Sequence, residues 1–232
     1  MTSDAEVPVL ARRYLDRALP GGASMPRRLR IGQEGTMRLR PGGRPLRFTA
    51  LEEFAVEEVA FSWRARFPIL PLVYLRVVDG YAAGAGHLEA RLFGLVPVMR
   101  ARGKEISEGE AYRYLAELPW VPHAILANRR LEWRELDAHA VEVATRVGSA
   151  RPAVKVEFDA AGDIVGTRCD ARPYREGRTS ASRPWARTFG DYAVIGGVRI
   201  PTRAEVRWEL PDGAFTYWRG TVTSLEIEPV LQ

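Results

Sequence analysis

The feature that most constrains the fold is a succession of short segments in which apolar and polar residues alternate. In residues 61–67 every second side chain is aromatic or Ala, and the side chains between them are Ser and Arg. Successive side chains of a strand point to opposite faces, so this alternation predicts an antiparallel strand with one buried face. About ten such segments follow one another at hairpin spacing. Turn sequences such as Pro41–Arg44, Asp159–Asp163 and Pro211–Gly213 separate them.

Two segments depart from this alternation and predict helices. Residues 6–19 carry apolar side chains near a 3.6-residue spacing, and Pro20 followed by two glycines ends that segment. Residues 107–127 form the second segment, with Ser107 as the expected N-cap and Glu110 as its expected capping-box partner. We expect Pro119 to end or kink this helix and Pro122 to allow only a short second turn.

The segments together predict a single domain over residues 1–232 that is mainly antiparallel β, or β-rich α+β. Its sheet runs from about residue 27 to 230 and is interrupted by the helix 107–127. A sheet of this size must curl to bury one face, which gives a half-barrel or barrel. The N-terminal helix (about 6–19) and the central helix then pack against the concave face or the mouth, where such folds hold ligands. The segment 172–183, rich in Arg, Gly, Ser and Thr, predicts an exposed loop.

Composition excludes several kinds of site. The chain has one cysteine, Cys169, so it forms neither an internal disulfide nor a cysteine metal cluster. We expect Cys169 to be a small core residue, with a nucleophilic role as the alternative. The three histidines lack the spacing of metal ligands, so we predict no metal. The sequence has neither a Gly-x-Ser-x-Gly elbow nor a phosphate loop, and we predict no cofactor.

The charge pattern bears on partners and location. The net charge is +5 and the isoelectric point is near 9.6, but acidic residues are interleaved with basic ones, so we predict no nucleic-acid partner. No window reaches the roughly 18 apolar residues of a transmembrane segment. The N-terminal residues lack the basic start and apolar stretch of a secretory signal. We therefore expect a cytoplasmic location, and the sequence leaves the oligomeric state undefined.

The central helix carries three candidates for chemistry. Arg113 and Glu117 are four residues apart and lie on one helix face. They are either a surface ion pair, which contributes little, or a paired charge inside an apolar cavity that holds a polar group or moves a proton. His123 is a candidate acid or base because the ordinary pKa of histidine lies near neutrality, and the alternative is a helix-capping or packing role.

A fourth candidate, Asp79, precedes a glycine-rich segment. Asp79 is either a general base or a turn-forming residue. Gly84 and Gly86 predict a tight hairpin or a close approach of another backbone. Neither belongs to a dinucleotide fingerprint, because the remaining glycine and the βαβ context are missing.

Aromatic residues, most of them at strand positions, are candidates for ligand contact. Core packing is the default for each, but indole rings inside a barrel also suit a flat or long apolar ligand. The candidates are Trp63, Trp120, Trp133, Trp185, Trp208 and Tyr217.

Several short motifs resemble those of a bacterial family recorded as a domain of unknown function. The motifs are Arg13–Leu15, Gly35–Arg38, Phe61–Ala65, Asp79–Gly86, Arg113–Pro122, Gly197–Pro201 and Trp208. The Arg-x-x-x-Glu-x-x-Trp-x-Pro and Gly-x-x-Ile-Pro parts are the most specific. That family looks like a distant relative of the lipoprotein-carrier (LolA-like) fold. The resemblance implies an unclosed β-barrel with helices over an apolar concave face.

The leading expectation is a cavity that binds a hydrophobic small molecule or lipid-like ligand. The first alternative is a cofactor-independent cyclase or isomerase, with Arg113, Glu117, His123 and Asp79 as its polar groups. The second is a non-catalytic interaction module, which an exposed apolar patch in place of a cavity would favour.

Overall fold

One large antiparallel sheet dominates the computed structural model, which describes residues 7–20, 25–176 and 179–229. The helical elements are α1 (Val9–Ala18), α2 (Lys104–Ala116), the 3-10 turn η1 (Leu118–Trp120) and α3 (Pro122–Ala127). The strands are β1 (Pro26–Met37), β2 (Leu46–Ala55), β3 (Phe61–Leu70), β4 (Val73–Ala82), β5 (Ala85–Leu92), β6 (Val96–Arg102), β7 (Glu132–Asp137), β8 (Ala140–Ala144), β9 (Ala153–Phe158), β10 (Ile164–Glu176), β11 (Thr179–Ile195), β12 (Val198–Leu210) and β13 (Gly213–Pro229).

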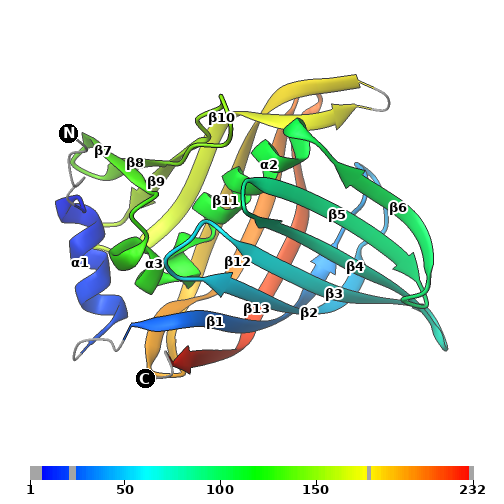
Figure 1. Cartoon of the computed structure of the whole chain (residues 1–232), viewed down its shortest axis with the longest axis horizontal. Coiled ribbons are helices and arrows are strands. Elements are labelled where there is room, and N and C mark those ends of the chain that lie inside the picture. Colours follow the sequence, from blue (N-terminus) through cyan, green and yellow to red (C-terminus); the bar gives the residue numbers. More distant parts are fainter. Residues whose placement is uncertain (1–6, 21–24, 177–178, 230–232) are drawn as a thin grey trace.

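The strand order shows how the two halves of the chain join. The order is β6-β5-β4-β3-β2-β1-β13-β12-β11-β10-β9-β8-β7, so each half is a meander and β1 pairs with β13 in the middle. In the described part of the chain β6 and β7 are the two edges, and the sheet curls without closing (Figure 1). The predicted half-barrel of mainly antiparallel β structure is confirmed.

The segment that joins the two edge strands runs inside the curl. α2 packs on β4, β5 and β6 of one wall and on β9 and β10 of the other, while η1 packs on β12. Figure 1 shows α2 and α3 lying between the two walls, with α1 at one end. α1 contacts α3, β8 and β12. The helices therefore fill one end of the half-barrel, as expected.

The alternation of residues predicts the buried face correctly. In β3 the aromatic side chains of residues 61, 63 and 67 are buried, and the Arg side chains at 64 and 66 are exposed. β9 and β12 repeat the alternation with Val, Ile and Trp inside. Burying such rings contributes roughly 1.5–3 kcal/mol each, which makes the concave face the core of the protein.

The central helix differs from the prediction at its start. α2 begins at Lys104, three residues before Ser107, because Gly103 at φ 114° turns the chain out of β6. The Ser107 hydroxyl donates to the carbonyl of Gly103 and accepts from the backbone N–H of Gly86, both at 2.9 Å. The predicted N-cap and capping box are therefore wrong, and Glu110 lies in mid-helix. The breaks expected at Pro119 and Pro122 are confirmed by η1 and α3.

Both glycine expectations near Asp79 are confirmed. Gly84 sits in the β4–β5 turn at φ 80°, and Gly86 lies against α2, where a Cβ would come within 2.8 Å of Ser107 Cα. Asp79 itself is a strand residue of β4, paired with Trp63 and Leu88, and not a turn residue.

Two other predicted segments differ from the structure in their bounds. The loop predicted at 172–183 is wrong, because β10 continues to Glu176 and β11 starts at Thr179 with paired backbones. The first helix is Val9–Ala18, and the predicted positions 6 and 230 lie outside the described residues.

Leu72 offers a test of backbone strain at the β3–β4 hairpin. It follows Pro71 in a two-residue turn at φ 67°, and its side chain is 93% exposed. A side chain at positive φ costs about 1–2 kcal/mol, whereas glycine adopts it freely. We expect Leu72→Gly to raise the free energy of unfolding by about 0.5–1 kcal/mol in urea denaturation. Leu70→Gly, in the adjacent strand, is the control and should lower it.

Candidate ligand-binding cavity

A cavity of about 1090 Å³ lies between the concave face of the sheet and α2. Strands β3–β6 of one wall and β10–β13 of the other contribute to its lining, so both halves of the chain are needed to form it. Ligand pockets usually measure about 300–1,000 Å³. The cavity thus has room for a multi-ring or lipid-like molecule.

Most of the wall is apolar. Its aromatic members are Trp63, Phe67, Tyr174, Trp208, Phe215, Tyr217 and Trp218. The ring of Trp208 packs on those of Tyr174 and Tyr217, with centroid separations of 4.7 and 6.4 Å. These neighbouring rings form a wall that supplies large contact area to an apolar ligand.

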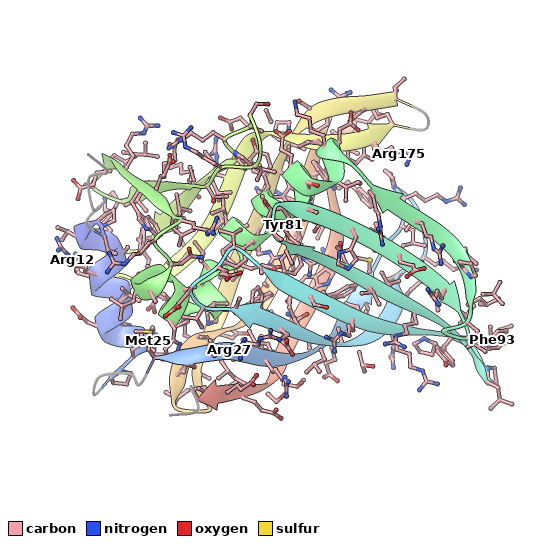
Figure 2. All side chains as sticks on the ribbon, viewed as in Figure 1. Arg12, Met25, Arg27, Tyr81, Phe93 and Arg175 are labelled. Atoms are coloured by element: carbon pink, nitrogen blue, oxygen red, sulfur yellow. The ribbon has the colours of Figure 1, made fainter. Side chains whose placement is uncertain are left out.

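Basic side chains gather where the cavity meets solvent. The contributing residues are Arg38, Arg100, Arg102, Lys104 and Arg175. Figure 2 shows Arg175 near the end of the β10–β11 hairpin, far from Arg12 on α1. The mouth therefore lies away from the end of the half-barrel that α1 covers.

Deeper in, the cavity meets a group of charged side chains that we call the buried charge cluster. The cluster consists of Glu52, Asp79, Glu110, Arg113, Glu117, Arg172 and Arg187. Five of its members line the cavity, whereas Glu52 and Glu117 lie behind them. In the described ranges, no three His, Cys, Asp or Glu residues are placed to hold a metal ion.

Arg113 is the centre of this cluster. Its Nη1 donates to Asp79 Oδ2 at 2.7 Å, its Nη2 to Glu52 Oε1 at 2.7 Å, and its Nε to Glu117 Oε1 at 3.0 Å. The guanidinium also lies over the rings of Phe61 and Trp63. One side chain of α2 is thus tied to β2, β4 and its own helix by charge-assisted bonds, which are the strong ones.

Arg187 supports Glu117 from the opposite wall. Its Nη2 donates to Glu117 Oε1 at 2.6 Å. Its guanidinium carbon lies 4.9 Å from the ring centroid of Trp120 and 5.7 Å from that of Trp218. Cation–π contacts of this kind strengthen when water is excluded.

Arg172 links the cluster to the backbone of α2. Its Nε and Nη2 both donate to the carbonyl of Gly109, at 3.1 and 2.9 Å. Its Nη2 lies 4.0 Å from Glu110 Oε1, and its guanidinium lies over the ring of Trp185. Gly109 has no side chain to separate the helix backbone from this arginine.

Several buried polar atoms of the region have no hydrogen-bond partner in the described structure. The atoms are Asp79 Oδ1, Glu110 Oε2, Glu117 Oε2, His123 Nδ1, and Nε and Nη1 of Arg187. Buried polar groups are normally satisfied, and each exception calls for an explanation. Two of the carboxylate oxygens belong to residues that line the cavity.

The two cavity-lining carboxyl groups resist ionisation. Burial raises the pKa of Glu110 to about 8, and the nearby Asp79 carboxylate adds to that shift. Burial also raises the pKa of Asp79, although Arg113 opposes the change. Raised carboxyl pKa values in a cavity mark candidate functional groups.

Behind the cavity wall the two glutamates differ. Burial raises the pKa of Glu52 to about 8, with Glu117 adding to the shift. For Glu117 burial acts in the same direction, but Arg113 and Arg187 outweigh it and hold the pKa below its usual range. A proton on Glu52 or Glu110 thus relieves the repulsion among the carboxylates.

Family membership follows from the sequence. The profile of a family of unknown function, DUF6544, matches residues 2–220. The chain belongs to the DUF6544 family. No curated protein matches the chain.

Among solved structures, this DUF6544 member is similar to one described as a "putative outer membrane lipoprotein-sorting protein domain" from Vibrio parahaemolyticus. The two share 10% identity with a TM-score of 0.51, over 96% of this chain and 92% of the other. A LolA superfamily protein from Nitrosomonas europaea aligns at 9% identity with a TM-score of 0.45, over 99% and 96% of the two chains. The predicted family of unknown function with a distantly LolA-like fold is confirmed.

Three of the predicted polar residues in this family member come together. Arg113, Glu117 and Asp79 form one bonded group, and the Arg113–Glu117 pair is buried, not exposed. His123 is also buried, in α3, outside the cavity lining, and burial lowers its pKa. Asp79 and Arg113 reach the cavity, whereas Glu117 and His123 do not.

Some of the predicted aromatic residues line the cavity and others do not. Trp63, Trp208 and Tyr217 line the cavity. Trp120 and Trp185 are fully buried beside Arg187. Trp133 is half-buried at the edge strand β7.

Two cluster members that were not predicted, Glu52 and Arg187, nevertheless carry a signal in the sequence. Glu52 lies between Phe48 and Phe54 on the inward face of β2, and Arg187 lies between two inward aromatic residues of β11. A charge at an inward position of an alternating strand is such a signal. Arg172 has none, because a register shift after Cys169 breaks the alternation.

An exposed apolar surface occurs at the hairpin tips, where Figure 2 labels Phe93. This hairpin-tip patch consists of Leu70, Leu72, Phe93, Leu95 and Val96, which are 41–93% exposed. The two hairpins touch through Tyr74 and Phe93. In the described residues, no helix is long and apolar enough to cross a membrane.

Proposed function

We propose that this protein binds a hydrophobic or lipid-like small molecule inside the half-barrel cavity. The observation that carries the proposal is the large cavity with an aromatic wall on both sides. Burying about 300 Å² of apolar ligand surface there would contribute about 7 kcal/mol before the costs of association. The fold similarity to a protein named for lipoprotein sorting supports the same class of function.

A blocked cavity tests the proposal. Val77 lines the cavity from β4, and its neighbour Val78 points to the opposite face of the same strand. We expect Val77→Trp to weaken binding of N-phenylnaphthylamine, a neutral fluorescent probe, by about tenfold or more, because an indole fills the binding volume. Val78→Trp is the matched control and should bind as the unmodified protein does. Equal affinity of the two variants would refute binding in this cavity.

A cofactor-independent cyclase or isomerase is the second candidate. It is favoured by Glu110, whose pKa of about 8 beside an apolar wall allows proton transfer near neutral pH, and burial also raises the pKa of the neighbouring Asp79. Turnover of an apolar substrate that is lost in Glu110→Gln but not in Glu108→Gln would support it.

The third candidate is a non-catalytic interaction through the hairpin-tip patch. Native mass spectrometry tests this candidate by measuring the oligomeric state.

The cytoplasmic location stays a prediction. Cell fractionation with an antibody against the chain tests it directly.

A further inference from the structure

The outer face of one wall of the half-barrel carries a group of arginines that we call the outer arginine face. It lies on β3, β4, β5 and β6 and consists of Arg64, Arg66, Arg76, Arg91, Arg100 and Arg102. All four strands lie within the described residues, and Glu89 is the one acidic residue on this face of them. Its carboxylate is shared by Arg91 and Arg100. The wall therefore presents a clear excess of positive charge to its surroundings.

Three of these arginines form a row of like charges. Arg66 is directly opposite Arg76, and Arg76 is directly opposite Arg91. Side chains in such positions have Cβ atoms about 4.5–5.5 Å apart, and like charges there destabilise a sheet. Among the described residues neither Arg66 nor Arg76 has a carboxylate partner, and Arg66 lies over the ring of Tyr74. An anionic surface against this face would relieve the repulsion.

Apolar hairpin turns lie at one end of the same wall. In an antiparallel meander every second turn is at the same end, so the β1–β2, β3–β4 and β5–β6 turns are neighbours. Figure 1 shows the last two at the end of the half-barrel opposite α1. Of the fifteen large apolar residues that are exposed in the described ranges, nine lie in these three turns or in the strand ends beside them. Leu72 and Leu95 protrude furthest, with 93% and 76% exposure.

The combination of charge and apolar tips distinguishes between possible partners. A nucleic acid would pair with the arginines but would leave the protruding leucines in water. A second copy of this chain would bring the same positive charges together. A bilayer that contains anionic lipid offers phosphate groups to the arginines and an acyl boundary to the leucines.

We infer that this wall docks on an anionic lipid bilayer, with the hairpin-tip patch at the acyl boundary and the outer arginine face at the level of the headgroups. The spacing along the strands agrees with this arrangement. Arg66, Arg76 and Arg91 each lie four residues from an apolar tip residue, namely Leu70, Leu72 and Leu95. Four strand residues span about 13 Å, so tilted strands place the row of arginines among or just above the headgroups.

The cavity opens toward the same end. Leu39, Val98 and Met99 line it and are also exposed, so its apolar lining continues to the surface beside the tips. A lipid-like ligand would therefore face the bilayer. The inference goes beyond the proposed binding function, because it assigns a partner to the outside of the sheet.

Co-sedimentation with lipid vesicles tests the docking. The two vesicles contain phosphatidylcholine alone or phosphatidylcholine with about one third phosphatidylglycerol. We expect the protein to bind the anionic vesicles about tenfold or more tightly. Added salt should weaken this binding, because it screens the charges of the arginines and of the headgroups.

A pair of substitutions tests the arginines. Arg66→Gln with Arg76→Gln should weaken binding to the anionic vesicles by about tenfold, because both side chains belong to the row. The matched control is Arg203→Gln with Arg219→Gln, on the outer face of β12 and β13, where the side chains are 66% and 46% exposed. The control loses the same charge and should bind within about threefold of the unmodified protein.

A second pair tests the apolar tips. Leu72→Asn with Leu95→Asn should weaken binding by about tenfold or more, because the tips then have no apolar side chain to insert. Asparagine tolerates the positive φ of Leu72, so the turn is kept. Val9→Asn with Val194→Asn is the control at the α1 end, where these side chains are 55% and 62% exposed, and it should bind as the unmodified protein does.

Several results would overturn the inference. They are equal binding to the two vesicles, equal losses in a variant and its control, and binding of a DNA duplex as tight as that of anionic vesicles. A dimer that only the Leu72 and Leu95 variant dissociates, without vesicle binding, would assign the patch to a second copy. Val77→Trp should dock as the unmodified protein does, since docking does not need the cavity. Failure of ligand binding and failure of docking are thus measured separately.

Discussion

Arg113→Met should lower the free energy of unfolding by about 3–5 kcal/mol, the largest effect that we expect from a single substitution. Methionine fills much of the same volume but leaves Glu52, Asp79 and Glu117 without their shared cation. Glu117 keeps its bond to Arg187, but Asp79 must then stay ionised without its partner or take up a proton. Urea denaturation at about pH 7, followed by tryptophan fluorescence, measures the change.

Arg134→Met is the control for this substitution. Arg134 pairs with Glu142 on the surface and its side chain is 63% exposed, so its loss should change stability far less than the loss of Arg113. Arg113→Lys keeps the positive charge but cannot bond three carboxyl groups at once. It replaces Arg113→Met if that variant does not fold, and it should lower the free energy of unfolding by more than Arg134→Met does. Equal losses for Arg113→Met and Arg134→Met would show that the cluster gives no net support to the fold.

The second large effect concerns pH. Glu52 and Glu110 have pKa values of about 8 in the folded protein, above the ordinary value of about 4.3 for the unfolded chain. The folded state thus binds protons that the unfolded state has lost. Their contribution to stability is complete below about pH 4 and disappears as the pH rises through about 8. We expect stability to fall by up to about 1.4 kcal/mol per pH unit for each group between about pH 6.5 and 8.

Other groups act outside this window. The lowered pKa of Glu117 adds stability that is lost only as the pH falls below the ordinary carboxyl range. The lowered pKa of His123 makes stability rise with pH, but only up to about 6.5. Urea denaturation across the window measures the slope. Glu110→Gln should remove much of it and Glu108→Gln should not, whereas a stability that is flat over this range would contradict the raised pKa values.

The fold was predictable because its signals are local. The side chains of a strand alternate by backbone geometry, so residues 61–67 reveal a buried face without knowledge of any partner strand. Pro119 and Pro122 break the helix for equally local reasons, namely a missing donor and a fixed φ. Ser107 does not cap the helix, because its hydroxyl bonds the carbonyl of Gly103 and the backbone N–H of the distant Gly86.

The site was predictable only in part. The spacing of Arg113 and Glu117 showed that they share a helix face, and the structure pairs them. Nothing local connects Arg113 to Glu52 or Asp79, which lie 61 and 34 residues away in the chain. The inward positions of Glu52 and Arg187 were readable from the alternation of their strands, but the break at Cys169–Arg172 removed that signal for Arg172.

The sequence by itself determined most of the strands and turns, the helix breaks and the aromatic face, since each depends on backbone geometry within a few residues. The tertiary structure decided which charges are buried together and which of them reach the cavity. The physical reason is that desolvation depends on enclosure from all sides. Only the curl of the sheet, with α2 packed between its two walls, removes water from Arg113 and its carboxylates.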